Sequence, residues 1–509
     1  MLIRAGSATR SQHRSSWQGT ASQLGWLACI AAPWLSPRAS GPSASVDQWL
    51  LTGLSVAGML ALSGLAVSFT SEGQRSQARG AIMTGWLVAA LLSTVIALCQ
   101  YFGVADLFPA IMSSTSTNEP FANLRQRNQF ASLTVIGMAV LLWLSTQGLS
   151  RTAGIAAMAF LAAGNAATAS RAGALEMLVI LVMAWMWRGP YRAALGKLSA
   201  AGIGAYVAAS LALPLLGEMV PQSLAYGVLG RFGQDEGCAS RMVLWSNVLH
   251  LIAQKPWTGW GWGNLDYAHY MTLYPGPRFC DVLDNAHNLP LQLGVELGIP
   301  VSVFVCAVAG WFVWRHAPWR EHRPARRAAW WILIVIAIHS MVEYPLWYGP
   351  FLMALCLCAG FIAIPPGESP SGQERRLPVA WRLASAGVVL AAALFCGWQY
   401  QLASQIYLPA EQRLPAYRED TLRKIRDAWL FNDQIRFAEL TITPLTAANA
   451  GWTLEAARQL LHFSPEPRVI EKLIESAMLL KLDDEAATHM QRYRAAFPKD
   501  YARWLKLRS

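Results

Sequence analysis

Charged side chains are scarce in this sequence of 509 residues, where Asp, Glu, Lys and Arg together make up only 14%. Soluble domains usually contain about 25% charged residues, so most of this chain does not have the composition of an ordinary soluble enzyme. Hydrophobic residues make up 54%, and the mean hydropathy is +0.30. The composition therefore indicates an integral membrane protein.

Several motifs of nucleotide and metal chemistry are also missing. The sequence contains no Asp-x-Asp, no Walker A motif and no His/Cys spacing typical of zinc sites. Asp281 and Asp284 lie only three residues apart in an expected loop, which gives a metal-bound nucleotide-sugar mechanism little support. There is no basic stripe with interleaved aromatic residues either. We therefore expect no metal, no cofactor and no nucleic-acid partner.

Long apolar runs dominate the first 404 residues. A helix needs about 20 apolar residues to cross the roughly 30 Å hydrocarbon core. Runs of this kind lie near 21–36, 48–70, 80–102, 130–147, 152–169, 172–188, 197–216, 289–314, 328–347, 349–365 and 380–400. The first is short, and only Ser170 and Arg171 divide the fifth from the sixth, so the count ranges from about ten to twelve. We predict an all-α polytopic membrane protein with about eleven transmembrane helices.

Basic residues are distributed unevenly between the two sides that eleven spans define. If the N-terminus is cytoplasmic, most Lys and Arg residues of the membrane part fall on inside segments. This bias predicts a cytoplasmic N-terminal segment, 1–20, followed by a membrane domain, 21–404. It places the long loop 217–288 and the tail 405–509 in the periplasm. A cleaved signal peptide is not expected, because the basic residues near the start are followed by a long polar stretch.

Cysteine is sparse as well, and six of the eight cysteines lie within apolar runs. Burial as small hydrophobic residues is their simplest interpretation. The exceptions are Cys238 and Cys280, both in the long outer loop. In an oxidising periplasm they are a candidate disulfide, with two free thiols as the alternative.

The tail, 405–509, is much richer in charge than the membrane part. Apolar residues recur in it at helical spacing, as at Ile470, Leu473, Ile474 and Ala477. We predict a C-terminal soluble helical domain of tetratricopeptide-like hairpins, although no 34-residue repeat can be counted. A docking or stabilising role is the simplest interpretation, since nothing in the tail looks catalytic.

Polar residues concentrate at the expected outer ends of several spans. Such groups are costly in apolar surroundings and by default mark function. The clusters are Asn123 to Asn128, Ser170-Arg171, Ser240-Arg241 with the turn from Trp257 to Asn264, Asp284 to Asn288, and His339 to Tyr348. On the predicted topology all of them lie on the outer face, and we expect them to line one cavity.

In chain order these clusters read QRN, SR, SRxxLW, NAHN and HxxxEYPLWY. This order resembles the bacterial O-antigen ligase/polymerase superfamily, and within it the PglL-type protein O-oligosaccharyltransferases, whose members also carry a helical C-terminal domain. The resemblance covers essentially the whole chain. It implies a metal-independent, inverting glycosyltransferase of the bacterial inner membrane. Such an enzyme transfers a preassembled glycan from undecaprenyl-pyrophosphate to Ser/Thr hydroxyls of periplasmic or surface proteins, such as a pilin-like protein.

His287 is the candidate catalytic base and matches the essential histidine of the family's loop motif. Histidine changes charge near neutral pH and suits proton transfer from an acceptor hydroxyl. Asn288 and Pro290 fit the first turn of a helix. The alternative is therefore a purely structural helix cap that His287 completes together with Asn285 and Asn288.

Arg171 and Arg241 are the candidate pyrophosphate ligands and match the family's SR motifs. Guanidinium groups suit this role because they donate paired hydrogen bonds to phosphate oxygens. For Arg171, the alternative is a snorkelling contact with lipid headgroups. For Arg241, it is an ion pair within the loop, for example with Asp235 or Glu236.

Further candidates would bind glycan or acceptor. They are Gln126, Arg127, Asn128, Asn285, Asn288, His339, Glu343, Tyr344 and Tyr348. Helix capping is an equal alternative for the first three. His339 precedes Glu343 by one helical turn, and a structural pair beside Pro345 is a simpler interpretation than a second acid/base site. Trp260 and Trp262, in a Gly-rich turn, are candidates for stacking on sugar.

Two other functions stay open. A sugar hydroxyl in place of the protein acceptor would make the chain an O-antigen polymerase or a lipid A core ligase. A transporter or flippase is more distant, because it would place ionisable residues near mid-span, where only Glu176 and Glu296 are obvious candidates. Convergence of the polar clusters on one outer cavity would favour a transferase.

Overall fold

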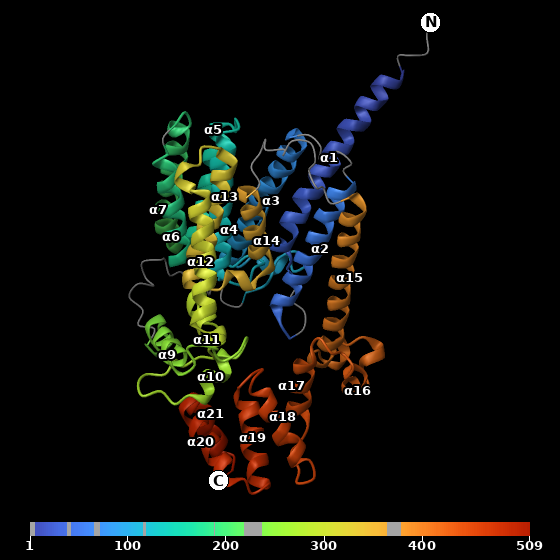
Figure 1. Cartoon of the computed structure of the whole chain (residues 1–509), viewed down its shortest axis with the longest axis vertical. Coiled ribbons are helices and arrows are strands. Elements are labelled where there is room, and N and C mark those ends of the chain that lie inside the picture. The colour runs from blue at the N-terminus through green and yellow to red at the C-terminus, as the bar shows by residue number, and fades with distance from the viewer. Residues whose placement is uncertain are drawn as a thin grey trace.

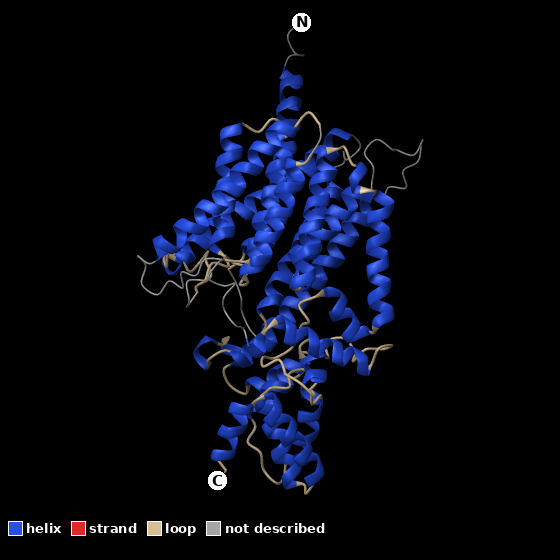
Figure 2. Cartoon of the chain, turned by 90° about the vertical axis from the view of Figure 1, so that its left-hand side faces the viewer, coloured by secondary structure: helices blue, strands red, loops and turns tan. Residues whose placement is uncertain are grey.

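The computed structural model describes residues 6–37, 42–65, 72–115, 119–187, 189–217, 237–363 and 378–508. Residues 1–5 of the expected N-terminal segment and 218–236 of the expected loop lie outside this part. The described residues form helices and loops without any strand (Figure 2). Long helices stand side by side in a bundle, and the two termini lie at opposite ends of the molecule (Figure 1).

The described part of each predicted apolar run falls largely on helical structure. The bundle helices are α1 (Gly6–Leu35), α2 (Ala44–Leu65), α3 (Glu72–Tyr101), α4 (Arg127–Ser145), α5 (Arg151–Ala167), α6 (Arg171–Trp185), α7 (Arg192–Gly217), α12 (Ile299–His316), α13 (Pro324–Val342), α14 (Gly349–Ala363) and α15 (Val379–Ser404). Among the described residues, seven helices are long and apolar enough to cross a membrane. The all-α membrane fold is thus confirmed, and the exact number of spans stays a prediction.

The run predicted as a single span over 289–314 is instead two helices. α11 (Leu289–Leu297) ends at Gly298, which has a φ of +87°, and α12 follows at once. A Cβ at position 298 would lie 2.3 Å from the carbonyl oxygen of Trp257, so glycine is required there. The Trp260 and Gly261 amides donate to the last carbonyls of α11 at 2.8 and 2.9 Å. The Gly/Trp turn therefore caps the C-terminus of α11.

Helix α4 lies at the centre of the bundle, because its residues from Gln129 to Leu142 are all buried. Helix α6 approaches it very closely at Gly173, where a Cβ would lie 2.4 Å from the Cβ of Ala131. Small residues allow this kind of contact between membrane helices. The contact brings the start of α6 beside the start of α4, where the polar residues lie.

The outer loop folds below the bundle. Its described part contains η2 (Gly237–Ala239), α9 (Arg241–Gln254) and α10 (Leu265–Met271), and α9 to α11 lie at the lower end of the bundle in Figure 1. A disulfide joins Cys238 to Cys280, with their Cα atoms 5.5 Å apart. Trp245 Nε1 donates to the Ala286 carbonyl at 3.0 Å. These links hold the start of α9 beside the segment that carries His287.

The tail forms a chain of short helices. They are η5 (Gln405–Tyr407), η6 (Ala410–Gln412), η7 (Pro415–Tyr417), α16 (Thr421–Ile425), α17 (Asn432–Ile442), α18 (Ala450–Leu460), α19 (Pro467–Leu479), α20 (Asp483–Ala496) and α21 (Pro498–Lys506). Outside the tail, three more short helices connect helices of the bundle: η1 (Ala105–Leu107), η3 (Pro318–Arg320) and η4 (Pro345–Trp347). Consecutive helices from α17 to α21 pack on one another. The tetratricopeptide-like assignment of this stack stays a prediction.

Helix α10 of the loop packs into the core of the tail. Tyr270 is buried there against residues such as Leu473, and its hydroxyl lies 2.9 Å from His489 Nδ1. Arg492 Nε donates to the Met271 carbonyl at 3.1 Å. The loop and the tail therefore share one packed core.

Replacing Tyr270 with Ala should loosen the tail, because it removes a fully buried ring, at a cost of about 3 to 5 kcal/mol. Tyr270→Phe is the matched control, since it removes only the hydroxyl and should cost about 1 kcal/mol. Hydrogen exchange of α19 and α20 in the intact protein measures both effects. Wild-type protection in Tyr270→Ala would contradict the packing of α10 into the tail.

Candidate active site

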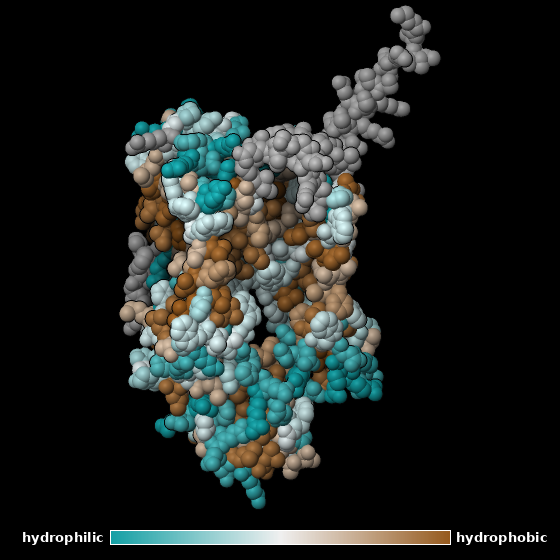
Figure 3. Space-filling model, viewed as in Figure 1, coloured by the Kyte–Doolittle hydropathy of each residue, from teal (hydrophilic) through white to brown (hydrophobic). Residues whose placement is uncertain are grey.

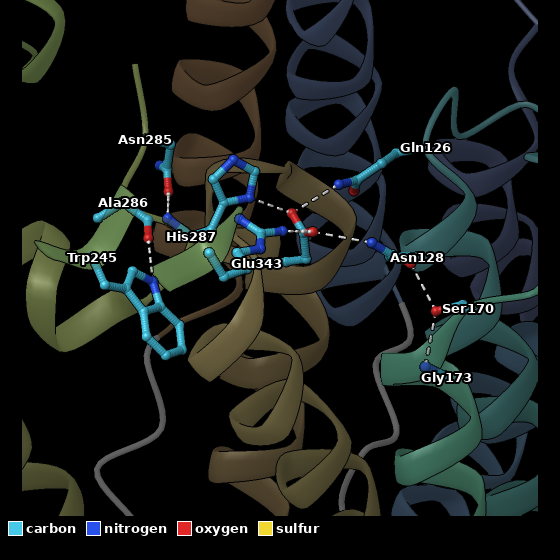
Figure 4. A network of polar contacts seen from close by, with 10 residues as sticks. Gln126, Asn128, Ser170, Gly173, Trp245, Asn285, Ala286, His287 and Glu343 are labelled. Carbon is cyan, nitrogen blue, oxygen red and sulfur yellow. Dashed lines mark hydrogen bonds and ion pairs between the residues drawn. The ribbon is translucent and has the colours of Figure 1, made fainter. Parts of the chain in front are cut away.

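Polar side chains from distant parts of the sequence meet around Glu343 (Figure 4). Glu343 directly follows the last residue of α13 and is only 4% exposed. Four helices begin around Glu343, namely α4, α6, α9 and α11. The structure therefore brings the predicted polar clusters together in one place.

Four side chains donate hydrogen bonds to the Glu343 carboxylate. His287 Nδ1 and Gln126 Nε2 contact Oε2 at 2.7 and 3.1 Å. Arg241 Nη2 and Asn128 Nδ2 contact Oε1 at 2.5 and 3.0 Å. An ionised carboxylate only accepts, so His287 must carry a hydrogen on Nδ1. This leaves Nε2 as the ring nitrogen that can accept a proton.

The surroundings of Glu343 favour its charged form. Burial alone would raise the pKa of its carboxyl group, but the hydrogen bond and charge of His287, together with the charge of Arg241, outweigh burial and lower that pKa. Glu343 is therefore ionised at neutral pH and acts as the shared counter-ion of an arginine and a histidine.

Two asparagines hold the backbone around His287. The residue has a φ of +50°, which is unusual for a side chain with a Cβ, and its amide donates to Asn285 Oδ1 at 2.8 Å. Asn288 Oδ1 caps α11 by accepting from the Leu291 amide at 3.1 Å, and its Nδ2 donates to the Met341 carbonyl. The asparagines thus make the turn and the helix cap, and the imidazole is left to face Glu343.

The two SR motifs share one local structure. Ser170 and Ser240 are the N-caps of α6 and α9, and each hydroxyl accepts from an amide in the first turn. Each arginine is the first residue of its helix. Helix N-termini carry partial positive charge, so an arginine there adds to an anion-binding environment. The capping serines were not predicted as site residues, although Ser before an apolar run is a recognisable cap signal.

The arginines differ in position. Arg241 reaches the centre of the cluster and forms an ion pair with Glu343. Its expected loop partners, Asp235 and Glu236, lie outside the described residues. Arg171 is exposed, and its neighbour Ser170 donates to Asn128 Oδ1 at 2.7 Å. The structure therefore places Arg171 on the rim of the same cluster.

The three residues of the QRN segment, Gln126 to Asn128, have different partners in the structure. Gln126 occupies the N-cap position of α4, but its side chain makes no capping hydrogen bond and contacts Glu343 instead. Asn128 also faces the carboxylate. Arg127 forms an ion pair with Glu119 at 2.7 Å. Gln126 and Asn128 thus belong to the cluster, while the described contact of Arg127 lies outside it.

His339 does not form the expected side-chain pair with Glu343. Its Nδ1 lies 2.7 Å from Ser132 Oγ on α4, and the ring is fully buried. The pairing of residues four apart requires a helix through both, but α13 ends at Val342 and Glu343 has extended backbone. His339 therefore links α13 to α4 by a hydrogen bond that lies deeper in the bundle than Glu343.

Aromatic rings surround the cluster. Tyr344 lies edge-on to His287 with ring centres 5.0 Å apart, and it stacks on Tyr348. Trp262 is 62% exposed and stacks on Trp347, with ring centres 5.8 Å apart. A crevice beside Glu343 is lined by Tyr344 and Trp347 among others.

Two further tryptophans of the site region have defined places in the structure. Trp260 is half-buried and donates to the Leu251 carbonyl at 3.0 Å, so it is a structural residue of the loop. Trp347 lies in the predicted cluster from His339 to Tyr348 but is not among the predicted site residues. Its signal was its place in the EYPLWY segment, directly after residues that were singled out.

These features define a polytopic helical membrane protein that has a histidine, a paired arginine and four helix N-termini at one end of its bundle. Among the described residues, no group of three or more His, Cys, Asp and Glu side chains is placed to hold a metal ion. The arrangement suits general-base chemistry beside a bound anion.

Three known families match parts of the chain. Residues 120–144 match a family described as a protein glycosylation ligase, and residues 156–306 match the O-antigen ligase family. Residues 327–509 match the C-terminal part of a virulence factor membrane-bound polymerase family. All the predicted site residues lie within these three ranges.

Two curated proteins of Acinetobacter baylyi are similar to this chain. A general O-oligosaccharyltransferase is 25% identical over 301 residues, covering 57% of this chain and 51% of that protein. A ComP-specific O-oligosaccharyltransferase is 22% identical over 284 residues, covering 55% and 50%. The chain thus spans about half the length of the curated relatives it matches. These findings confirm the resemblance to PglL-type protein O-oligosaccharyltransferases.

The charge of Glu343 should make stability depend on pH in a defined direction. Because its pKa is lowered in the folded protein, its stabilising effect is complete above about pH 5 and is lost as the pH falls through that lowered pKa. Glu343→Gln lacks the charge, so the difference in Tm from wild type should be largest near neutral pH and shrink in acid. Thermal unfolding in detergent measures this, and a difference independent of pH would contradict the assigned charge.

Proposed function

We propose that this protein transfers a preassembled glycan from undecaprenyl-pyrophosphate to Ser/Thr hydroxyls of periplasmic or surface proteins, such as a pilin-like protein. The observation that carries the proposal is the joint contact of His287 and Arg241 with Glu343, where four helices begin. Similarity to two O-oligosaccharyltransferases supports the same function.

In this mechanism His287 is the general base. Glu343 holds Nδ1–H, which fixes the ring orientation and stabilises the imidazolium ion that forms when Nε2 takes the proton of the acceptor hydroxyl. The hydroxyl oxygen attacks the anomeric carbon, and the bond from that carbon to the pyrophosphate oxygen breaks. Direct displacement inverts the anomeric carbon. Glu343 acts through His287 and is a positioning residue.

The leaving group is a pyrophosphate that gains negative charge as its bond to the sugar breaks. In the proposal, Arg241 and Arg171 stabilise this charge together with the helix N-termini that they start. The lipid chain lies against the apolar bundle within the membrane. Gln126, Asn128, Tyr344 and Tyr348 orient glycan or acceptor, while Asn285 and Asn288 act by shaping the His287 backbone.

The proposed orientation puts the N-terminus in the cytoplasm and the site and tail in the periplasm of a bacterial inner membrane. Three observations support it: the basic residues favour this side, the termini lie at opposite ends of the bundle, and the disulfide belongs to the loop that carries His287. The proposed domains are a cytoplasmic segment 1–20, a ligase-like membrane domain 21–404 and a helical domain 405–509.

A sugar acceptor is the second candidate, because residues 327–509 match a family described as a polymerase. A transporter has less support, since the polar clusters meet at one end of the bundle. The deciding experiment offers a pilin-like protein and a lipid A core side by side to the purified protein with a lipid-linked oligosaccharide. Product on the protein alone is expected, and product only on the core would make the chain a core ligase.

His287→Ala should lower the rate of transfer by at least about 100-fold, because a positioned general base contributes that much or more. His250→Ala, on α9 of the same loop, is the matched control and should transfer normally. Formation of the Cys238–Cys280 disulfide reports correct folding of the loop in both variants. Full transfer by a correctly folded His287→Ala protein would refute the assignment.

Arg241→Lys should lower kcat/KM for the lipid-linked donor about tenfold or more, because lysine keeps the charge but loses the paired hydrogen bonds. Arg171→Lys should have a smaller effect, since Arg171 lies on the rim. Arg127→Lys is the control, because its ion pair with Glu119 points elsewhere. Initial rates at varied donor concentration measure the three variants, and equal losses in all of them would contradict the proposed roles.

A further inference from the structure

A basic hollow lies where α15 leaves the bundle, and the proposed reaction does not use it. η5 follows α15 directly, and the chain then turns around a cavity of about 550 Å³. Its lining includes one carboxylate, Asp420, and four arginines: Arg413, Arg418, Arg423 and Arg426. Figure 1 shows α16 at the foot of α15, away from α9 and the loop that carries His287.

Only part of this positive charge is paired. Arg423 contacts Asp420 at 3.1 Å, and Arg426 contacts Glu439 at 2.7 Å. The hydrogen bonds of Arg413 go to the Leu408 carbonyl and the Thr421 hydroxyl, both at 2.9 Å. These neutral acceptors orient Arg413 without cancelling its charge, so the hollow keeps a net positive charge.

A second arginine of the hollow is held in the same way. Arg418 Nε donates to the Arg413 carbonyl at 3.4 Å, and the Arg418 side chain is exposed. Arg413 and Arg418 both line the hollow. Two neighbouring guanidinium groups with neutral partners form a setting that a phosphate group would neutralise.

Aromatic contacts place the hollow at the level of the membrane surface. Trp429, just after α16, is 66% exposed, and its ring lies 6.1 Å from that of Phe395 on α15. Trp398 on the same helix is 56% exposed. Exposed tryptophans of membrane proteins settle at the headgroup level. Figure 3 shows hydrophilic surface gathering beneath the hydrophobic surface of the bundle at the foot of α15.

We propose that this hollow binds the phosphate of an anionic phospholipid headgroup. Arginine forms paired hydrogen bonds with phosphate, and the nearby tryptophans favour the same headgroup level. Anionic lipids are preferred over zwitterionic ones, because the amine of a zwitterionic headgroup would meet the same arginines. The bound lipid anchors the start of the tail to the membrane surface.

The test compares lipid retention by the full-length protein. Wild type and a variant with Arg413→Gln and Arg418→Gln are placed in nanodiscs of phosphatidylcholine containing a minor share of cardiolipin, and lipids kept by the released protein are counted by native mass spectrometry. Wild type should retain cardiolipin, and the variant should retain at least about fivefold less. Raised salt should weaken retention by wild type, because it screens exposed charges.

The control variant is Arg458→Gln with Arg503→Gln, two exposed arginines on α18 and α21 that pair with carboxylates elsewhere in the tail. It should retain cardiolipin like wild type, and Tm values in pure phosphatidylcholine should be alike in all proteins. Equal loss in both variants would overturn the proposal, as would equal retention. Binding of a soluble acidic peptide to wild type in pure phosphatidylcholine, lost in the Arg413/Arg418 variant, would instead identify a protein-binding surface and also overturn it.

Discussion

Four helices begin around the carboxylate of Glu343, and their arrangement depends on its negative charge. The N-termini of α4, α6, α9 and α11 each carry partial positive charge, and Arg241 adds a full one. Without a buried anion these ends would repel each other in a site of low dielectric. Because Glu343 lies in the extended residue after α13, its side chain can turn away from that helix and accept from four donors at once.

Parts of the molecule far from this carboxylate fix its surroundings. The disulfide and the Trp245 hydrogen bond hold the loop beside the start of α11. Helix α10 then anchors the same loop in the core of the tail, through Tyr270. The tail therefore contacts the loop that carries His287, and among the described residues it contributes no hydrogen bond to Glu343.

The sequence predicts the helices well, because only helices with long apolar faces are stable in the hydrocarbon core. It misses the break at Gly298, since both halves of that run are equally apolar. The polar clusters identify most of the residues around Glu343, but not their partners. Arg127 forms an ion pair with Glu119, and Arg241 forms one with Glu343, which is 102 positions away in the sequence. The partner of each arginine depends on tertiary packing, which the local spacing of residues does not encode. Helix α10 is too short for the sequence pattern to reveal that it is buried in the tail.

The geometry around Glu343 is also set by a contact deeper in the bundle. Helices α4 and α13 run antiparallel, and two polar contacts join them, Asn128 to Glu343 and Ser132 to His339. Asn128 and Ser132 are one helical turn apart on α4, while His339 lies on α13 and Glu343 directly follows it, so the two contacts fix one register between the helices. Sliding either helix would break both, and a buried imidazole without a partner is costly in apolar surroundings. His339 therefore has a structural role that does not depend on catalysis. Its hydrogen bond to Ser132 fixes the axial position of α4 at which Asn128 contacts the Glu343 carboxylate.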